Sequence, residues 1–343
     1  MSFAPEICVI IAAKDASATI GRALRSALRE AEVTEVFVVD DGSADATAEA
    51  AHAADDGTGR LRIARLEANR GPAFARNCAI AHSDAPLVAI LDADDFFLPG
   101  RFARLLNQQD WDLIADNIVF LDADHAAAEP DVAEFDAAPR SLQLVDFVDG
   151  NISKRGAPRG EIGFLKPVIR RDFLEHAGLR YREDLRLGED YEFYVRALAR
   201  GGRYRLVHGC GYGAVVRPDS LSGRHRTDDL KRLYEADRTI LETERLSAEE
   251  KAAISRHERH VRARYELRNF LDIKAKSGLA RAGLHGLANP GALPAIVSGI
   301  ALDKYDAFGA GHAQPDVVSA SPRYLLPAAP ARKAATDPVR PHI

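Results

Sequence analysis

The strongest constraint on the fold of this chain is an alternation of short apolar runs with helix-like segments between Ile7 and Leu98. The apolar runs are ICVIIAA, VFVVDD, LRIARL and LVAILDADD, and amphipathic segments separate them. Short apolar runs between helices are typical of strands that are buried on both faces of a parallel sheet. Residues 1–100 are therefore predicted to form a nucleotide-binding half of βαβ type.

Three further parts follow this half. Residues 101–226 contain strand-like runs at 113–120 and in GFLKPVIRR, and we expect them to pack on the same sheet. In residues 227–283, apolar residues recur at helical intervals, which predicts a helical extension of two helices. Residues 284–343 are rich in Pro, Ala and Gly and are expected to be a loop-rich, partly disordered tail. The predicted fold class is α/β, with a doubly wound, mostly parallel sheet.

The composition excludes several classes of protein. A chain of 343 residues with 46% hydrophobic residues can bury a large core, and its net charge of -5 argues against a surface committed to nucleic acid. The three cysteines form no CxxC pair, which favours a reducing compartment. Neither a signal peptide nor an apolar run long enough to span a membrane is evident. We expect a cytoplasmic protein that does not bind nucleic acid.

Three carboxylates follow the fourth apolar run, in LVAILDADDFFLPGRF. In open α/β sheets ligands bind beyond the carboxyl ends of the strands, where Asp92, Asp94 and Asp95 would lie. Adjacent carboxylates repel one another unless a cation lies among them, and Mg²⁺ or Mn²⁺ is commonly held by one or two carboxylates together with phosphates. The alternative is a solvated acidic loop that caps a helix beginning near Pro99.

The second apolar run also ends in carboxylates, in FVVDDGSADAT. Asp41 in this position is a candidate acceptor for the imide N–H of a uracil ring, and Ser43 is placed to cap the next helix. The alternative is that Asp-Gly-Ser is only a turn and cap signal.

Two further charged candidates lie on predicted helices. In LRLGEDYEFYVRAL, Asp190 is a candidate general base, although Glu189 and Asp190 also suit a helix N-terminus because of the helix dipole. In NRGPAFARN, Arg76 is a candidate partner of Asp41 or of a bound anion, and the alternative is an ordinary surface arginine.

A basic segment lies within the predicted helical extension. Residues Lys251 to Arg281 contain nine Lys or Arg against three Asp or Glu, in a chain that is acidic overall. Either this segment contacts an anionic surface, or it belongs to two solvated helices.

The order VIIAAKD, VVDDGSADAT, NRGPAFARN, LDADDFFLP and GEDYEFYVRAL resembles the family 2 glycosyltransferases with a GT-A fold, over about the first 215 residues. The resemblance implies an inverting transfer from a nucleotide sugar, with residues 1–100 as the nucleotide-sugar-binding half and residues 101–226 as the acceptor-binding half. It assigns uracil to Asp41, ribose and metal to the DxD pair Asp92 and Asp94, and the base to Asp190. Asp94 would be the direct metal ligand, supported by Asp95.

Other positions follow from the same resemblance. Ala13 and Asp15 would lie near the nucleotide, and Arg76 near the donor. This chain departs from the family where its first strand ends, because AAKD replaces the usual Pro-x-Tyr/Phe-Asn sequence. The segment YGAVVRPDSLSGRH resembles a mobile loop that closes over the diphosphate through Arg217, Ser220, Ser222 and His225.

Bacterial exopolysaccharide enzymes, including succinoglycan-type glucosyltransferases, are the group within the family that the chain resembles. The resemblance implies UDP-glucose as the donor, Mg²⁺ or Mn²⁺ as the cofactor, and a glycan or lipid-diphosphate-linked glycan as the acceptor. The basic segment would then provide a peripheral contact with the inner face of the cytoplasmic membrane.

Two other functions are alternatives to a transferase. A haloacid dehalogenase-type phosphatase also uses an apolar strand that ends in Asp-x-Asp with Mg²⁺, but it expects Thr or Val where Phe96 stands, and it expects this strand first. A nucleotide-sugar or divalent-cation binding module would use the same carboxylates without turnover.

Overall fold

The computed structural model describes residues 6–122, 132, 139–153, 160–216, 226–309 and 323–326. Its strands are β1 (Ile7–Ala13), β2 (Val33–Asp40), β3 (Leu61–Arg65), β4 (Leu87–Ile90), β5 (Phe96–Phe97), β6 (Leu113–Asp122), β7 (Arg140–Leu142), β8 (Val168–Arg170), β9 (Tyr204–Val216) and β10 (Arg323–Tyr324). The helices are α1 (Ile20–Leu28), α2 (Thr47–Ala53), α3 (Pro72–His82), α4 (Arg101–Leu106), α5 (Leu144–Asp149), α6 (Arg171–His176), α7 (Glu189–Ala199), α8 (Thr227–Thr243), α9 (Ala248–Ala288) and α10 (Leu293–Gly309), with short 3₁₀ turns at Ile162–Phe164 and Pro290–Ala292.

The ten strands form one sheet. Its main order is β3-β2-β1-β4-β8-β6-β9-β5, with β10 paired to β6 and β7 paired to β9. The first four strands are parallel, and β8 joins them to the second half by antiparallel pairing with both β4 and β6. The chain adds β2 and β3 on one side of β1 and β4 on the other, so β1 and β4 flank a topological switch point. The predicted α/β class is confirmed.

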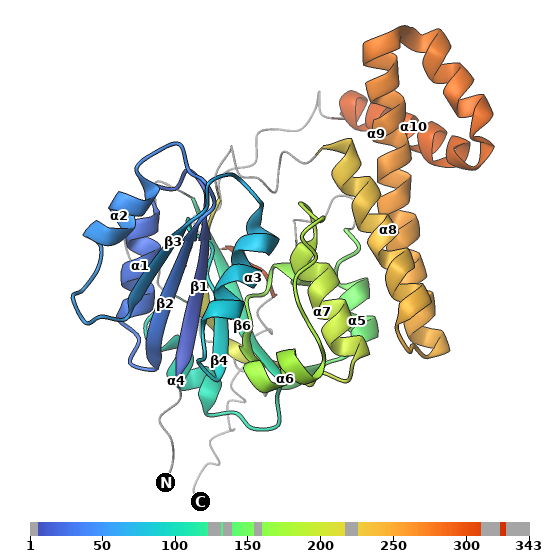
Figure 1. The fold of residues 1–343 in the computed structure, drawn as a ribbon. Coiled ribbons are helices and arrows are strands. Elements are labelled where there is room, and N and C mark those ends of the chain that lie inside the picture. The colour runs from blue at the N-terminus through green and yellow to red at the C-terminus, as the bar shows by residue number, and fades with distance from the viewer. Residues whose placement is uncertain are drawn as a thin grey trace, which may run out of the picture.

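Helices cover both faces of the parallel part of the sheet (Figure 1). Helices α1 and α2 pack together on one face, and α3, whose connection runs in the opposite direction along the sheet, covers the other. As a result β1 is buried along almost its whole length, with Ile7 through Ile11 completely inaccessible to solvent. This double burial explains why its sequence is a continuous apolar run rather than an alternating one.

The second half continues the same sheet without a break. Strands β4 and β8 pair across the expected boundary at residue 100, so the boundary does not divide the sheet. The division into a nucleotide-sugar-binding half and an acceptor-binding half stays a prediction about function. Of the run GFLKPVIRR, only Val168–Arg170 is a strand. Pro167 lacks the backbone N–H that a ladder requires, which accounts for the late start of β8.

The helical extension is longer than the sequence indicates. Helices α8 and α9 pack along each other as expected, but α9 continues past residue 283 and α10 follows it, so residues 284–309 are helical rather than loop-rich. These helices are stabilised by a small core of their own, which consists of Phe270, Ala282, Ala292 and Ile296. Further along, residues 323–326 add β10 to β6 and bury Leu325, while the other residues of the expected tail lie outside the described part.

Across the residues that the structure describes, no helix combines the length and the apolar character that crossing a membrane requires.

Candidate active site

The loops after β1 and β2 are joined at the carboxyl edge of the sheet. Asp15 donates its backbone N–H to the Ser43 hydroxyl (2.9 Å), and its carboxylate accepts the N–H of Ala44 (2.7 Å). Lys14 Nζ donates to the carbonyl of Gly42 (2.7 Å). Ser43 therefore does not cap α2 as expected, because its hydroxyl is used between the loops. The sequence AAKD, which departs from the family pattern, places Asp15 in this junction with a left-handed backbone conformation (φ 48°).

Asp41 fixes a third loop at the same edge. It is 3% exposed, and its two carboxylate oxygens accept the backbone N–H groups of Arg70 (2.6 Å) and Gly71 (2.8 Å). Its own N–H donates to the carbonyl of Ala13 at 2.8 Å. These bonds hold the residues just before α3, so Asp41 and Ala13 lie together where the nucleotide was expected.

A cluster of five charged side chains lies beyond the end of β4. Asp92 Oδ1 pairs with Arg76 Nη2 (2.9 Å), and its Oδ2 pairs with Lys166 Nζ (3.0 Å). Asp190 pairs with the same two cations, at 2.8 Å from Arg76 Nη1 and 2.7 Å from Lys166 Nζ. Glu189 lies 3.2 Å from Arg76. Two residues far apart in sequence thus share both buried cations, and we call these five residues the ion cluster.

Four segments of the fold bring the ion cluster together, and Asp92 lies in the one that follows β4. Arg76 lies one turn into α3, which begins at Pro72 in the position where proline suits a helix start. Asp190 lies in the first turn of α7, after a left-handed Gly188 at the N-cap (φ 72°). Lys166 lies just before β8 and is 5% exposed.

Burial and mutual attraction determine the protonation of these groups. Burial would raise the pKa of Asp92, but the Lys166 and Arg76 cations outweigh it and lower that pKa to about 2. Burial, followed by the charge of Asp190, raises the pKa of Glu189. For Lys166, burial opposes the charged form, yet the Asp190 and Asp92 carboxylates raise its pKa above the ordinary value. Asp92 and Lys166 are therefore charged at neutral pH.

Two expectations about Arg76 are corrected here. It is not a surface residue, since it is 4% exposed, and it does not pair with Asp41 but with Asp92, Glu189 and Asp190. Lys166 was not among the residues predicted for the site, because it lies within a strand-like run. A single lysine inside the apolar sequence FLKPVI was the available signal, because an unpaired lysine is almost never buried.

Asp94 and Asp95 differ in their surroundings. Asp95 is buried, and its oxygens accept the Tyr212 hydroxyl (2.8 Å) and the Val215 N–H (2.9 Å). Burial, followed by the charges of Asp94 and Asp92, raises the pKa of Asp95. Asp94 is half-buried, and its backbone carbonyl accepts a hydrogen bond from Arg22 (3.3 Å). The three aspartates therefore do not form one solvated acidic loop.

No three His, Cys, Asp or Glu side chains converge as a ready metal site within the described residues. Such a cage is not required for Mg²⁺, which is commonly bound by one or two carboxylates together with substrate phosphates and waters. Asp92 and Asp95 use their oxygens within the protein, Asp92 in the pairs with Arg76 and Lys166 and Asp95 in the bonds from Tyr212 and Val215.

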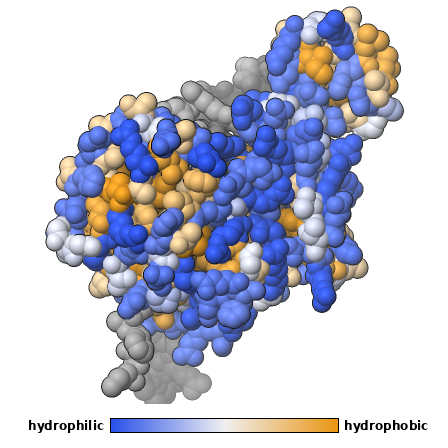
Figure 2. All heavy atoms as spheres, viewed as in Figure 1, coloured by the Kyte–Doolittle hydropathy of each residue, from blue (hydrophilic) through white to orange (hydrophobic). Residues whose placement is uncertain are grey.

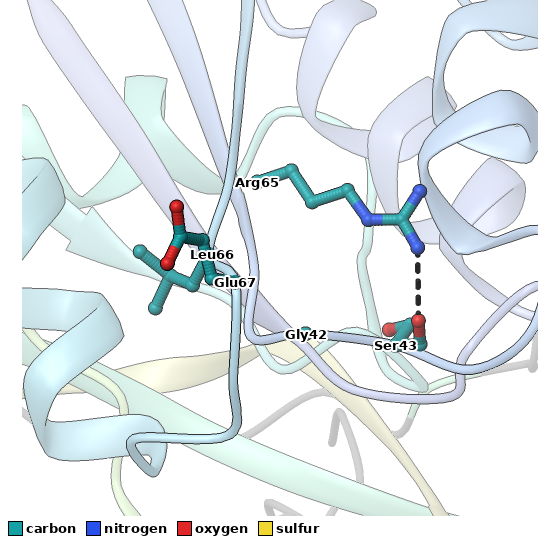
Figure 3. A pocket seen from close by; sticks show the side chains of 5 residues that line it. All are labelled: Gly42, Ser43, Arg65, Leu66 and Glu67. Carbon is teal, nitrogen blue, oxygen red and sulfur yellow. Dashed lines mark hydrogen bonds between the residues drawn. The ribbon is translucent and has the colours of Figure 1, made fainter.

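A small cavity of about 260 Å³ opens beside the loop that follows Asp41. Arg65 extends across it and donates to the backbone carbonyl of Ser43 at 3.0 Å, with Leu66 and Glu67 on the opposite side (Figure 3). None of the ion cluster lines this cavity. The loop residues Arg217, Ser220, Ser222 and His225, expected to close over a diphosphate, lie outside the described residues.

The chain is similar to known proteins over most of its length. The family described as Glycosyl transferase family 2 matches residues 8–123. Two proteins of Rhizobium meliloti (strain 1021) are similar over most of their length. Succinoglycan biosynthesis protein ExoU is 60% identical over 88% of this chain and 89% of that protein, and succinoglycan biosynthesis protein ExoO is 36% identical over 84% and 83%.

The fold also matches a solved structure. S. aureus TarS 1-349 in complex with UDP-GlcNAc aligns with a TM-score of 0.58 at 19% identity, over 84% of this chain and 79% of that chain. At this identity the match supports the fold alone. Together with the extended similarity to ExoU, these findings show that the chain is a glycosyltransferase of family 2 with the GT-A fold.

Proposed function

We propose that this enzyme is a metal-dependent inverting transferase that moves a hexose, glucose from UDP-glucose, onto a glycan acceptor during exopolysaccharide synthesis. The observation that carries the proposal is the shared pairing of Asp92 and Asp190 with Arg76 and Lys166. It brings the candidate DxD aspartate and the candidate base into one site, although they come from different elements of the fold.

Asp190 is proposed as the general base. The acceptor hydroxyl attacks the anomeric carbon and forms the new C–O bond, while the bond to the diphosphate breaks and its electron pair leaves with the phosphate. The hydroxyl proton passes to Asp190. Each carboxylate oxygen has two lone pairs, so the bonds to Arg76 and Lys166 still leave Asp190 able to accept this proton.

Asp41 is proposed to accept the imide N–H of uracil through the lone pairs that its two backbone bonds leave free. Ala13 and Asp15 border the same nucleotide position, since Ala13 bonds to Asp41 and Asp15 fixes the neighbouring loop. The cavity beside Gly42 would extend this position. Arg76 would contribute positive charge behind the donor rather than a direct contact with Asp41.

Asp94 is proposed as the ligand of Mg²⁺ or Mn²⁺, with Asp92 near the ribose and the ion. Buried Asp95 lies beside both aspartates, and after burial it is their negative charges that raise its pKa; a cation at Asp94 would neutralise this charge. When bound, the ion stabilises negative charge on the departing diphosphate.

The names of the relatives support the choice of pathway. ExoU and ExoO are both described as succinoglycan biosynthesis proteins, and their similarity spans most of this chain. We therefore propose that the product is part of an exopolysaccharide of this kind, and that the acceptor is a growing glycan carried on a lipid diphosphate. Membership of the glycosyltransferase family removes the phosphatase alternative.

Donor binding tests the proposal directly. Thermal unfolding would be followed with UDP-, GDP- and dTDP-sugars, each with Mg²⁺ or Mn²⁺, because a ligand that binds only the folded state raises its stability. We expect stabilisation by UDP-glucose with metal, and its loss in Asp94→Ala. Stabilisation of the wild type by GDP- or dTDP-sugars alone would contradict the assignment of Asp41 to uracil. Donor binding without sugar transfer to any glycan acceptor would favour the binding module instead.

A further inference from the structure

Exposed apolar side chains are concentrated at one end of the molecule. Among the described residues, seven large apolar side chains are notably exposed, and six of them lie between Leu271 and Leu302. The most exposed are Leu279 (66%), Leu284 (66%), Leu287 (71%) and Val297 (64%). We call residues 270–302 the distal arm. It stands away from the sheet at the upper right of Figures 1 and 2, where apolar surface is visible at its end.

The distal arm is a structured unit rather than a loose end. Gly278 (φ 83°) interrupts α9, and the chain turns there so that the end of α9 and α10 pack on each other. Their contact buries Phe270, Ala282 and Ile296. The exposed leucines are therefore not part of this core, and they remain in contact with water. A folded apolar surface of this kind marks a site of interaction.

Charge identifies the partner. The distal arm contains three basic residues, Lys274, Lys276 and Arg281, and one acidic residue, Asp272, whose carboxylate accepts a hydrogen bond from the Thr227 hydroxyl of α8. All three basic residues are exposed. Apolar side chains bordered by basic ones match the interface of an anionic bilayer, where leucines enter the acyl boundary and lysines meet the headgroups.

The first part of the basic segment has a different role. Between Lys251 and Val261, α9 packs against α8 and α5, with Ala253, Ile254 and His257 buried. Arg256 is paired with Asp149 at 2.7 Å. The expected membrane contact over Lys251–Arg281 is thus narrowed to the part of α9 beyond Phe270, and it is extended into α10.

We propose that the distal arm docks the enzyme on an anionic membrane surface through Leu279, Leu284, Leu287 and Val297, with Lys274, Lys276 and Arg281 at the headgroups. The inference deepens the proposed function, because it names the surface that would hold the enzyme beside a lipid-linked acceptor. Binding to lipid requires no turnover, so it is tested separately from catalysis.

Vesicle co-sedimentation provides the test. The full chain would be mixed with vesicles of phosphatidylcholine and phosphatidylglycerol in equal parts, and with vesicles of phosphatidylcholine alone. We expect salt-sensitive binding to the anionic vesicles only. Leu284→Glu combined with Leu287→Glu should weaken it by about tenfold or more, since the apolar contact is lost and negative charge is added. Lys274→Glu with Lys276→Glu should weaken it by a similar factor and reduce its dependence on salt.

Matched controls come from outside the distal arm. Val216→Glu changes the remaining exposed apolar residue (45% exposed), and Lys231→Glu reverses an exposed charge on α8. Both should bind anionic vesicles like the wild type. The double leucine variant should unfold at the wild-type temperature and keep its transfer to a water-soluble acceptor.

Two results would overturn the proposal. One is the absence of binding to anionic vesicles, or equal binding by the wild type and the double leucine variant. The other is a dimer in sedimentation velocity that the leucine substitutions convert to a monomer, with no vesicle binding, because a second copy of the chain would then cover these side chains. If vesicle binding is confirmed while no sugar transfer is found, the docking surface stands and the proposed function fails.

Discussion

At the carboxyl edge of the sheet, charged side chains are buried, whereas in the distal arm apolar side chains are exposed. Arg76 and Lys166 are 4% and 5% exposed, while Leu284 and Leu287 are 66% and 71% exposed. Burying a charge carries a large desolvation cost, and leaving a leucine in water forgoes about 1.5–3 kcal/mol of burial. Neither arrangement is what stability alone would select.

The two regions differ in how this loss of stability is offset. In the ion cluster each cation is matched by two or more carboxylates from other elements, so the charges stabilise one another within the protein. In the distal arm nothing in the described part of the chain covers the leucines. The ion cluster is therefore complete without a partner and is ready to act on a ligand, whereas the distal arm requires an external surface.

Asp190→Asn tests the catalytic side of this comparison and should have the largest effect. The amide cannot accept the acceptor proton, so the transfer rate should fall by about 10²–10⁴-fold while UDP-glucose still binds. Turnover with a soluble acceptor and donor calorimetry would measure both quantities. Asp184→Asn removes an exposed carboxylate near α7 and should leave both unchanged. A transfer rate for Asp190→Asn within tenfold of the wild type would exclude it as the base.

Lys166→Met tests whether the ion cluster holds itself together. Removing one cation leaves Asp92 and Asp190 with Arg76 alone, and breaking a buried pair costs about 3–5 kcal/mol in the free energy of unfolding. The cost should lie at the lower end, because the Asp92 side chain is 34% exposed. Urea denaturation would measure it.

The control for Lys166→Met is Arg203→Met, which breaks an exposed pair with Asp112 and should cost less than about 1 kcal/mol. Combining Lys166→Met with Asp190→Asn should cost less than the sum of the two single changes, since they share one interaction. Simple additivity would mean that Lys166 does not act through Asp190.

The sequence predicted the first half of the fold well, because a strand that is buried on both faces needs a continuous apolar run, and polar residues follow where the strand ends. Asp190 came from the resemblance to the family, and the same logic located Asp41 and Asp92 near one edge of the sheet. It did not find Lys166, because the pairing of a lysine before β8 with carboxylates after β4 and in α7 depends on sheet order rather than on local sequence. It also missed α10, because Pro290, Gly291 and several alanines resemble a tail unless their packing on Phe270 is known.

Gly278→Ala tests whether the distal arm depends on its turn. The backbone of Gly278 (φ 83°, ψ 166°) is disfavoured for other residues, so alanine should destabilise the arm by about 1–3 kcal/mol. Gly283→Ala is the matched control, since neither glycine has an atom within 4 Å of an added Cβ and Gly283 is helical. It should instead stabilise by about 0.5–1 kcal/mol.

Hydrogen exchange of the arm amides would measure this difference, and the site at the sheet edge should keep its protection in both variants. Equal protection of the arm in Gly278→Ala and the wild type would show that the turn does not require glycine.

His260 lies on α9 before the distal arm begins, and its substitution should have the smallest effect on stability. It contacts the hydroxyl of Ser153 at 3.0 Å. Burial, followed by the charges of Arg264 and His257, lowers its pKa below the ordinary 6.5. The unfolded chain therefore binds this proton at a higher pH than the folded protein, so stability should fall as the pH decreases through about 6.5.

His260→Gln should reduce this acid-induced loss by less than about 1 kcal/mol, because the side chain remains partly open to solvent. Urea denaturation of wild type and variant at pH 8 and at about pH 5.5 would measure it, since the two values lie on either side of the ordinary histidine pKa. His176→Gln, at the exposed end of α6, serves as the control. Equal changes in the pH dependence of stability for His260→Gln and His176→Gln would show that His260 is as solvated as a surface histidine.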